Sequence, residues 1–300
     1  MSILELVKSI VPRTLRKPIA RMIGFNHLSW NGQKPVNFRN RTPETISKDV
    51  AYAVNVSRSY IDQLQAVGIP IQQSRILELG PGYHFAPNLV LASQGAHSSV
   101  ADRFLASWAS DYHPEFYTRF LAEWGSELPA VRRVIGARAY PADALTLHPH
   151  PAEDLQSVED QSQDVVLSNA VLEHVFSMER VCQEMARITA HDGYNIHQVD
   201  FRDHRDFGRP LEFLLMPDAA FRRQFDGCHG ECGNRVRSSQ VVAAFRNHGF
   251  ELIAFEVNER TAPDYLNSFL PRLRASQSAY KDHAADDLGV LGGRFIFRRD

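Results

Sequence analysis

The segment Arg75–Gly82, with the sequence RILELGPG, combines residue types that can hold a charged ligand. A short apolar strand carries Glu78 near its end, and Gly80, Pro81 and Gly82 follow. Glycine has no Cβ, so such a turn lets the backbone approach a ligand closely. A helix that follows the turn directs its free N–H groups at the same place. The segment therefore predicts a ligand-binding turn at the end of a strand.

Three acids indicate which ligand this turn accepts. Glu78 precedes the glycines, and a carboxylate there repels a phosphate but attracts a cationic amine. Asp102 follows the turn by about 20 residues, a spacing that suits a carboxylate accepting from both ribose hydroxyls. Asp143, in the sequence PADAL, could accept from the exocyclic amine of adenine. Together, the three acids suit a nucleoside whose tail is positively charged and carries no phosphate. S-adenosylmethionine is such a ligand.

A dinucleotide is the alternative ligand. Turns that bind NAD have the pattern G-x-G-x-x-G after the first strand. Here the position of the third glycine is Phe85, whose side chain would obstruct the pyrophosphate. An NAD-dependent oxidoreductase is therefore a second hypothesis, and Glu78 argues against it.

The elements that position these residues alternate between strand and helix. This alternation predicts an α/β fold with a doubly wound, mostly parallel seven-stranded sheet, in which the ligand lies beyond the carboxyl ends of the strands. We predict helices at 45–67, 88–94, 171–189 and 238–247, an irregular segment at 201–234 and a mainly helical one at 262–287. The clearest strands are 76–79, 98–101, 164–168, 194–199, 250–257 and 294–298.

Four segments occur in the order typical of class I S-adenosylmethionine-dependent methyltransferases, and the chain resembles that family over residues 75–199. ILELGPG resembles its first motif, VADRF the end of its second strand, and PADAL its adenine-side motif. DVVLSNAVLEHV resembles the fourth strand and the helix after it. The resemblance implies a Rossmann-like methyltransferase fold with S-adenosylmethionine as the cofactor.

The resemblance also implies roles for particular residues. The glycine turn would hold the methionine part of the cofactor, the acid after the second strand the ribose, and PADAL the adenine. The structural alternatives are a helix-capping Asp102, a surface Asp143, and Glu173 and His174 as residues that only anchor a helix. The implied cofactor-binding residues are Glu78, Gly80, Pro81, Gly82, Asp102, Asp143, Ala144, Asn169 and Ala170.

Methyl transfer to oxygen or carbon needs a base in addition to close placement of donor and acceptor. His197 lies in the fifth predicted strand, and Asp200 and His204 follow its carboxyl end. A histidine held by an aspartate has a suitable pKa and a fixed tautomer. We therefore expect His197, then His204, as the base, with Asp200 orienting it. A buried, structural His197 is the alternative.

No metal site is expected. Asp200 and Asp203 could bind a divalent cation, but no carboxylate cluster completes the coordination shell. Cys228, His229 and Cys232 supply only three ligands from one loop, so a loop with free thiols is the simpler interpretation.

Composition excludes several classes of protein. The apolar share of 44% is that of a globular chain, and a net charge of -2 gives no reason to expect nucleic acid as a partner. No apolar run is long enough to cross a membrane. Three cysteines make no disulfide framework, which favours a cytoplasmic location.

Residues 1–44 are expected to form a helical extension and linker, and residues 45–300 the methyltransferase domain. Residues 2–24 are basic and amphipathic, interrupted by Pro12 and Pro18. Such a segment could pack on the domain or rest on an anionic membrane at the inner face. The aromatic segment 104–128 could close over the site as a lid or simply cover the sheet.

The segments YNIHQVDFRDH, PLEFL and NRVRSSQVVAAFRNHGFEL are similar to methyltransferases encoded with bacterial surface-polysaccharide genes. This resemblance implies a small-molecule acceptor, with O-methylation of a sugar or glycan precursor. The alternative from another class is a member of the fold that binds the cofactor without catalysis.

Overall fold

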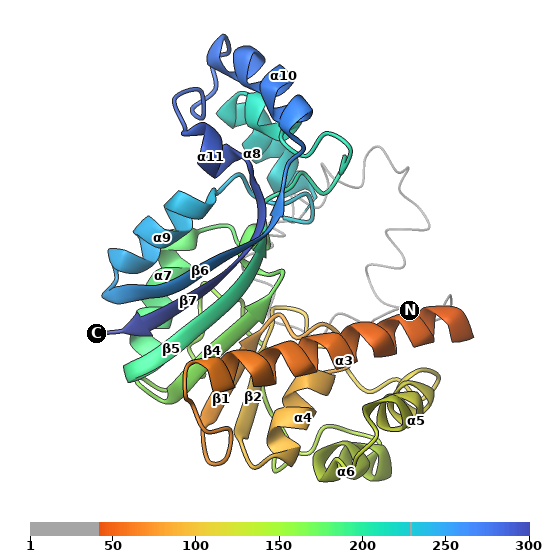
Figure 1. The fold of residues 1–300 in the computed structure, drawn as a ribbon. Helices are drawn as coiled ribbons and strands as arrows, with labels where there is room; N and C mark the ends of the chain where they lie inside the picture. The colour runs from red at the N-terminus through yellow and green to blue at the C-terminus, as the bar shows by residue number, and fades with distance from the viewer. Residues whose placement is uncertain (1–41, 229) are drawn as a thin grey trace, which may run out of the picture.

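A seven-stranded sheet forms the centre of the computed structural model, which describes residues 42–228 and 230–300. The strand order is β3-β2-β1-β4-β5-β7-β6, and β7 is antiparallel to both of its neighbours while the other pairs are parallel (Figure 1). The predicted doubly wound, mostly parallel sheet of a Rossmann-like methyltransferase is thus confirmed. The strands are β1 (Arg75–Leu79), β2 (His97–Ala101), β3 (Thr146–His148), β4 (Gln163–Asn169), β5 (Thr189–Asp200), β6 (Phe250–Arg260) and β7 (Val290–Arg299).

Helices cover both faces of this sheet. On one face α3 (Pro43–Ala66) runs across β1 and β4 and packs against α4 (Ala86–Ser93) and α5 (His113–Trp124). Next to α4 lies α6 (Pro129–Ala137). On the other face α7 (Met178–Ile188) and α9 (Ser238–Arg246) bury apolar side chains against the central strands.

The sequence explains why the central elements form. The buried, apolar residues of β1 and β4 suit strands that helices cover on both faces. The α3 helix begins at Pro43, whose missing N–H costs nothing in the first turn, and Thr42 Oγ1 accepts from Thr45 N at 3.3 Å. Apolar residues at helical spacing then face the sheet from α3.

Three predicted segments differ from the structure. Residues 171–189 form a short 3₁₀ helix, η2 (Leu172–His174), then an extended Val175, and only then α7, which Ser177 caps. The strand predicted at 194–199 already begins at Thr189, so Gly193 lies inside β5. The segment predicted to be irregular, 201–234, contains η3 (Glu212–Leu215) and α8 (Asp218–Gly227).

A helical lobe stands beyond the carboxyl end of β5 (Figure 1). It joins α8 and η3 to α10 (Pro263–Arg274) and α11 (Ala285–Leu288), which share a small apolar core around Phe213, Phe225 and Phe269. Across the described ranges, no helix is long and apolar enough to cross a bilayer.

The aromatic segment 104–128 is only partly helical, because α5 begins at His113. Phe116, Tyr117 and Phe120 are fully buried in the core beside α3 and α4, which fits the covering role better than the lid. The basic segment 2–24 lies outside the described residues, and α3 begins close to the domain boundary predicted at residue 45.

Candidate active site

A cavity of about 470 Å³ opens at the carboxyl ends of β1, β2 and β4. This is the sheet edge at which ligands bind in doubly wound folds. The predicted residues Gly80, Gly82, Asp102 and Ala170 all line it, so three segments distant in sequence meet there. The rest of the lining is Leu79, Ala101, Arg103, Phe104, Pro151, Ala152, Glu153, Val171, His174, Val175 and Glu231.

The glycine turn forms one wall of this cavity. Gly80 has φ +61°, and a Cβ built there would lie 2.4 Å from Val171 Cγ2. Gly82 has φ +72°, and a Cβ there would meet nothing within 4 Å in the described part of the chain. Close packing against Val171 therefore requires a glycine at position 80. At position 82 there is room for a side chain, and glycine is favoured there by the left-handed backbone conformation.

Aromatic side chains hold the chain just after this turn. The Tyr117 hydroxyl donates to the His84 carbonyl oxygen, and His113 Nε2 lies 2.8 Å from the Tyr83 carbonyl oxygen. Both side chains come from α5 and are fully buried. The α5 helix therefore supports the glycine turn from behind.

Asp102 follows β2 and lines the cavity. Its Oδ1 accepts from Phe104 N at 2.7 Å, which turns the chain sharply after the strand. The neighbouring Arg103 forms an ion pair of 3.4 Å with Glu153. Arg103 also lies over the Phe176 ring, 4.9 Å from its centroid.

Glu78 lies at the base of the turn and is almost completely buried. Its Oε1 accepts from the Tyr60 hydroxyl at 2.7 Å, whereas Oε2 has no hydrogen-bond partner within 42–228 and 230–300. Burial raises the pKa of Glu78 to about 7, although the hydrogen bond from Tyr60 opposes this shift. A cation close to Glu78 would favour the deprotonated form of its side chain, the carboxylate. Pro81 is buried beside it.

Asn169 ends β4, and Ala170 follows it in a left-handed conformation with φ +57°. Asn169 Nδ2 donates to the Tyr52 hydroxyl at 2.6 Å. Tyr52 comes from α3, and 54% of its surface is exposed. Sequence reasoning missed Tyr52, because nothing in a helix pattern shows that one exposed tyrosine reaches the end of β4.

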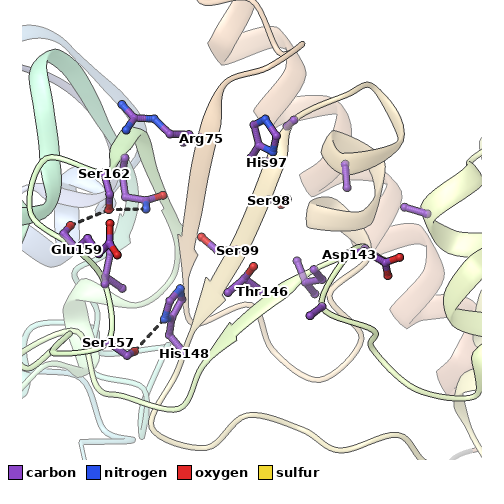
Figure 2. A pocket seen from close by; sticks show the side chains of 18 of the residues that line it. Arg75, His97, Ser98, Ser99, Asp143, Thr146, His148, Ser157, Glu159 and Ser162 are labelled. Carbon is purple, nitrogen blue, oxygen red and sulfur yellow. Dashed lines mark hydrogen bonds between the residues drawn. The ribbon is translucent and has the colours of Figure 1, made fainter.

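The structure does not bring Asp143 and Ala144 to this cavity. They precede β3 and therefore lie toward the amino ends of the strands, in a second cavity of about 690 Å³ with His97, Thr146 and His148 (Figure 2). The Arg133 guanidinium binds the Asp143 carboxylate, with Nε 3.0 Å from Oδ1. This placement argues against the adenine-side role that we predicted for PADAL.

The residues that occupy the expected adenine side follow β3 instead. Pro151, Ala152 and Glu153 line the carboxyl-end cavity near Asp102. The segment PAEDL has the same alternation of small and acidic residues as PADAL, so the sequence does contain a signal for it. PADAL precedes β3 in the chain and PAEDL follows it, and β3 has only three residues.

His197 does not line the cavity and is completely buried. Its Nδ1 lies 2.8 Å from Ser168 Oγ, and its ring packs on Phe245 of α9. Burial lowers the pKa of His197 to about 3. A base must contact the acceptor, so this placement argues against the catalytic role and favours the structural alternative.

Asp200 and His204 do lie together at the end of β5. His204 Nε2 is 3.5 Å from Asp200 Oδ2, and the Arg202 guanidinium donates to the same carboxylate at 2.6 Å. Burial alone would raise the pKa of Asp200, but the hydrogen bonds from His204 and Arg202 outweigh it and hold the pKa below its ordinary value. Asp200 is therefore a stable anion.

Glu173 lies in η2, between the ends of β4 and β5, and only 2% of its surface is exposed. Its Oε1 accepts from Asp200 N at 3.4 Å. Burial is the main cause that raises the pKa of Glu173 to about 8, and the charge of Asp200 adds to it. The sequence favoured an anchoring role for this residue over a chemical one.

Among the described residues, no group of three or more His, Cys, Asp or Glu side chains could hold a metal ion. Cys182, Cys228 and Cys232 are free thiols. The position of His229 lies outside the described residues.

Comparisons with known proteins bear on this site. Residues 100–196 match the family model described as a methyltransferase domain, from the end of β2 into β5. This match begins after the glycine turn, so it is independent of the ILELGPG segment. No curated protein matches the chain.

Solved structures that resemble the chain include a putative sarcosine dimethylglycine methyltransferase from Galdieria sulphuraria, at 15% identity and a TM-score of 0.47, with 82% of this chain and 85% of that chain covered. Geranyl diphosphate C-methyltransferase from Streptomyces coelicolor A3(2) has 13% identity and a TM-score of 0.46, covering 96% of this chain and 100% of its own. Nothing about the substrate of this chain follows from such distant likeness. Residues 100–196 are therefore similar to a methyltransferase domain, and they lie in a sheet that has the strand order of the predicted fold.

Proposed function

We propose that the chain is an S-adenosylmethionine-dependent methyltransferase that methylates a hydroxyl oxygen of a small carbohydrate, a sugar or a glycan precursor. The observation that carries the proposal is the carboxyl-end cavity, which the glycine turn and Asp102 line. Behind that turn lies the buried Glu78, one oxygen of which has no partner among the described residues. The acceptor class rests on the groups beside that cavity and on the similarity of residues 194–252 to methyltransferases of surface-polysaccharide genes.

The residues of the cavity fit S-adenosylmethionine. The Glu78 oxygen left without a partner in the described chain can receive its cationic end, and the open backbone at Gly82 leaves room for the methionine part. Asp102 would accept from the ribose hydroxyls, and Ala152 and Glu153 would lie along the adenine. When bound, the cofactor supplies a methyl group on a sulfonium, which is an electrophile.

The acceptor would approach from the side of Asn169 and Asp200. Two exposed aromatic rings belong to this side, Tyr52, bonded to Asn169, and Phe207, which lies 4.8 Å from the Arg202 guanidinium. Aromatic rings offer an apolar face for stacking, and fixed carboxylate and guanidinium groups offer hydrogen bonds to hydroxyls. This combination suits a polyol with apolar ring faces.

Calorimetry and a transfer assay test the proposal. We expect S-adenosylmethionine to bind and NAD to give no heat, and we expect labelled methyl from the cofactor to enter the sugar and nucleotide-sugar fraction of a bacterial extract. Binding without any methylated product would favour a non-catalytic member of the fold. Label that enters only nucleic acid or protein would contradict the carbohydrate acceptor.

We further propose that the enzyme works in the cytoplasm at the inner membrane face, with the basic residues 2–24 touching anionic lipid. Sedimentation with anionic vesicles should bring down the full chain, and a variant that lacks residues 2–24 should stay in solution. Equal sedimentation of the two would contradict this proposal.

A further inference from the structure

We propose that His174 is the base that takes the proton from the acceptor hydroxyl, an inference that rests on the transfer to oxygen proposed above. His174 is the last residue of η2, the short helix that follows β4. It lines the carboxyl-end cavity, so a molecule bound there meets its side chain directly.

His174 lies next to the wall that would hold the methyl donor. Val171 of the same chain segment also lines the cavity, and a Cβ built on Gly80 of the glycine turn would lie 2.4 Å from Val171 Cγ2. Asn234 fixes this segment, because its Nδ2 donates to the Leu172 carbonyl oxygen at 2.7 Å. A proton acceptor on this segment is therefore held beside the place of the methionine part of the cofactor.

One hydrogen bond decides which ring nitrogen of His174 is free. Nδ1 lies 2.8 Å from the Gly230 carbonyl oxygen, and a carbonyl oxygen can only accept, so the proton of the neutral ring is on Nδ1. Nε2 then carries the lone pair that a base needs. Among the described residues Nε2 has no hydrogen-bond partner, yet it is not sealed from solvent as Glu173 Oε2 is. An acceptor hydroxyl in the cavity can therefore donate to it.

The groups around His174 keep its ring neutral and prepare it for a proton. Burial is the main cause that lowers the pKa of His174, and the neighbouring His204 ring lowers it further. The hydrogen bond to Gly230 and the charges of Asp200, after β5, and Glu231, after α8, oppose this shift. The ring is therefore unprotonated near neutral pH, and the two carboxylates would stabilise the imidazolium once the proton arrives.

A row of rings connects His174 with the surface. The His204 ring meets the His174 ring edge-on, with 5.0 Å between their centroids, and stacks on Phe207 at 5.7 Å. The Phe207 side chain is exposed. An acceptor that stacks on Phe207 would extend along this row toward His174.

The other titratable groups near the strand ends are less suitable as a base. Glu78, Glu173 and His197 are buried and do not line the cavity. His204 does not line it either, and its Nε2 faces the Asp200 carboxylate at 3.5 Å. None of these four side chains presents a free acceptor atom to a molecule in the cavity.

The step balances as a displacement. The acceptor oxygen forms a bond to the methyl carbon while the carbon–sulfur bond breaks, and the electron pair of that bond stays on sulfur. The hydroxyl proton passes to His174 Nε2, and the imidazolium then releases it to solvent. No oxidant or reductant is needed.

The variant His174→Asn removes the base and keeps the hydrogen bond to Gly230, because the asparagine Nδ2 can still donate to that carbonyl oxygen. We expect methyl transfer to the sugar and nucleotide-sugar fraction of a bacterial extract to fall by about 100-fold. The Kd for S-adenosylmethionine should change by less than about twofold. His191→Asn is the matched control, because His191 is exposed near the start of β5 with its Nδ1 3.0 Å from a backbone oxygen of Asp300, and it should leave the rate unchanged.

Two kinetic readouts separate a base from a residue that only shapes the cavity. At saturating S-adenosylmethionine, the wild-type rate should fall only below about pH 6.5, the ordinary pKa of histidine, since the base is lost when it is protonated. This fall should be absent from the residual activity of His174→Asn. In His174→Ala, added imidazole should restore part of the transfer.

Nuclear magnetic resonance of ¹⁵N-labelled histidine rings gives a readout without turnover. At pH 7.5 one neutral ring with its proton on Nδ1 should be present in the wild-type chain and missing from His174→Asn. A His174 ring that is charged at this pH, or that carries its proton on Nε2, would show that the inference is wrong.

The outcomes distinguish the base from the proposed function. Transfer by His174→Asn at the wild-type rate would overturn the base and leave the carbohydrate assignment standing. Label that enters a different acceptor but still depends on His174 would overturn the carbohydrate and support the base. A wild-type chain that binds S-adenosylmethionine but transfers no methyl would contradict both.

Discussion

In the described part of the molecule, two cavities lie at opposite ends of the same parallel strands, and the larger of the two is not the candidate active site. The amino-end cavity has about 690 Å³ and the carboxyl-end cavity about 470 Å³. Parallel strands give the two ends different chemistry, because loops and helix N-termini converge only at the carboxyl ends. The volume of a cavity is therefore a poorer guide to the active site than the end of the strands at which the cavity lies.

The polar groups at the two ends of the strands also differ. At the amino end, Arg133 pairs with Asp143, and Arg75 pairs with Asp164 at 2.5 Å. Behind the carboxyl-end cavity, Glu78 and Glu173 each keep one buried oxygen that has no partner among the described residues, although neither residue lines the cavity. Exposed ion pairs therefore mark the amino end, and buried carboxyl groups mark the carboxyl end.

The largest effect should follow from Asp102→Ala, which removes the proposed ribose acceptor. Hydrogen bonds to a charged group contribute about 1.5–3 kcal/mol each, so we expect the Kd for S-adenosylmethionine to rise by about 100-fold in calorimetry. Asp102→Asn keeps one acceptor oxygen and should lose less. An unchanged Kd in Asp102→Ala would contradict the assignment of the carboxyl-end cavity as the cofactor site, which is the main distinction between the two cavities.

Gly80→Ala should have the next largest effect. The new Cβ would meet Val171 Cγ2 at 2.4 Å, and the left-handed backbone at φ +61° disfavours alanine. We expect the free energy of unfolding to fall by about 1–3 kcal/mol in denaturant titrations. Gly82→Ala has the same backbone strain without the clash and is the matched comparison. Equal losses in the two variants would show that Val171 moves aside easily.

The affinity for S-adenosylmethionine should depend on pH through Glu78. Its pKa is raised to about 7, so the carboxylate that attracts a cation is present above that pH and is lost as the pH falls through it. We expect the Kd to rise by about tenfold between about pH 8 and pH 6. Glu78→Gln should bind more weakly and without this pH dependence, and a pH dependence that persists in it would assign the effect elsewhere.

The smallest effect should come from the amino-end cavity. Asp143→Asn breaks an exposed ion pair with Arg133, so the free energy of unfolding should change by less than about 1 kcal/mol. The Kd for S-adenosylmethionine should stay the same. A large loss of cofactor binding would return Asp143 to the adenine-side role that its sequence context suggested.

The sheet could be predicted from sequence because its central strands are short apolar runs that end in glycines or acids. β1, β2 and β4 lie within two residues of their predicted limits. The 3₁₀ turn of η2 could not be predicted in the same way, because Val171–Thr189 keeps a helical spacing of apolar residues throughout. The extended Val175 and the Ser177 cap become visible only in the structure.

The site was harder to predict than the fold. The adenine-side prediction concerned PADAL, which precedes β3, and PAEDL after the strand was not considered. β3 has only three residues, none of them fully buried, so its position gave almost no apolar signal. His197 shows a related limit, since strand alternation defines two faces but does not say which one the substrate meets.

The contacts of α5 with the glycine turn have a thermodynamic consequence. Tyr117 and His113 hold the backbone at His84 and Tyr83 from the buried side, whether or not a ligand is present. A loop that is already preorganised loses little conformational entropy when it is occupied. The donor should therefore associate quickly and without a slow isomerisation, and any conformational change that limits turnover would belong to the acceptor side of the enzyme.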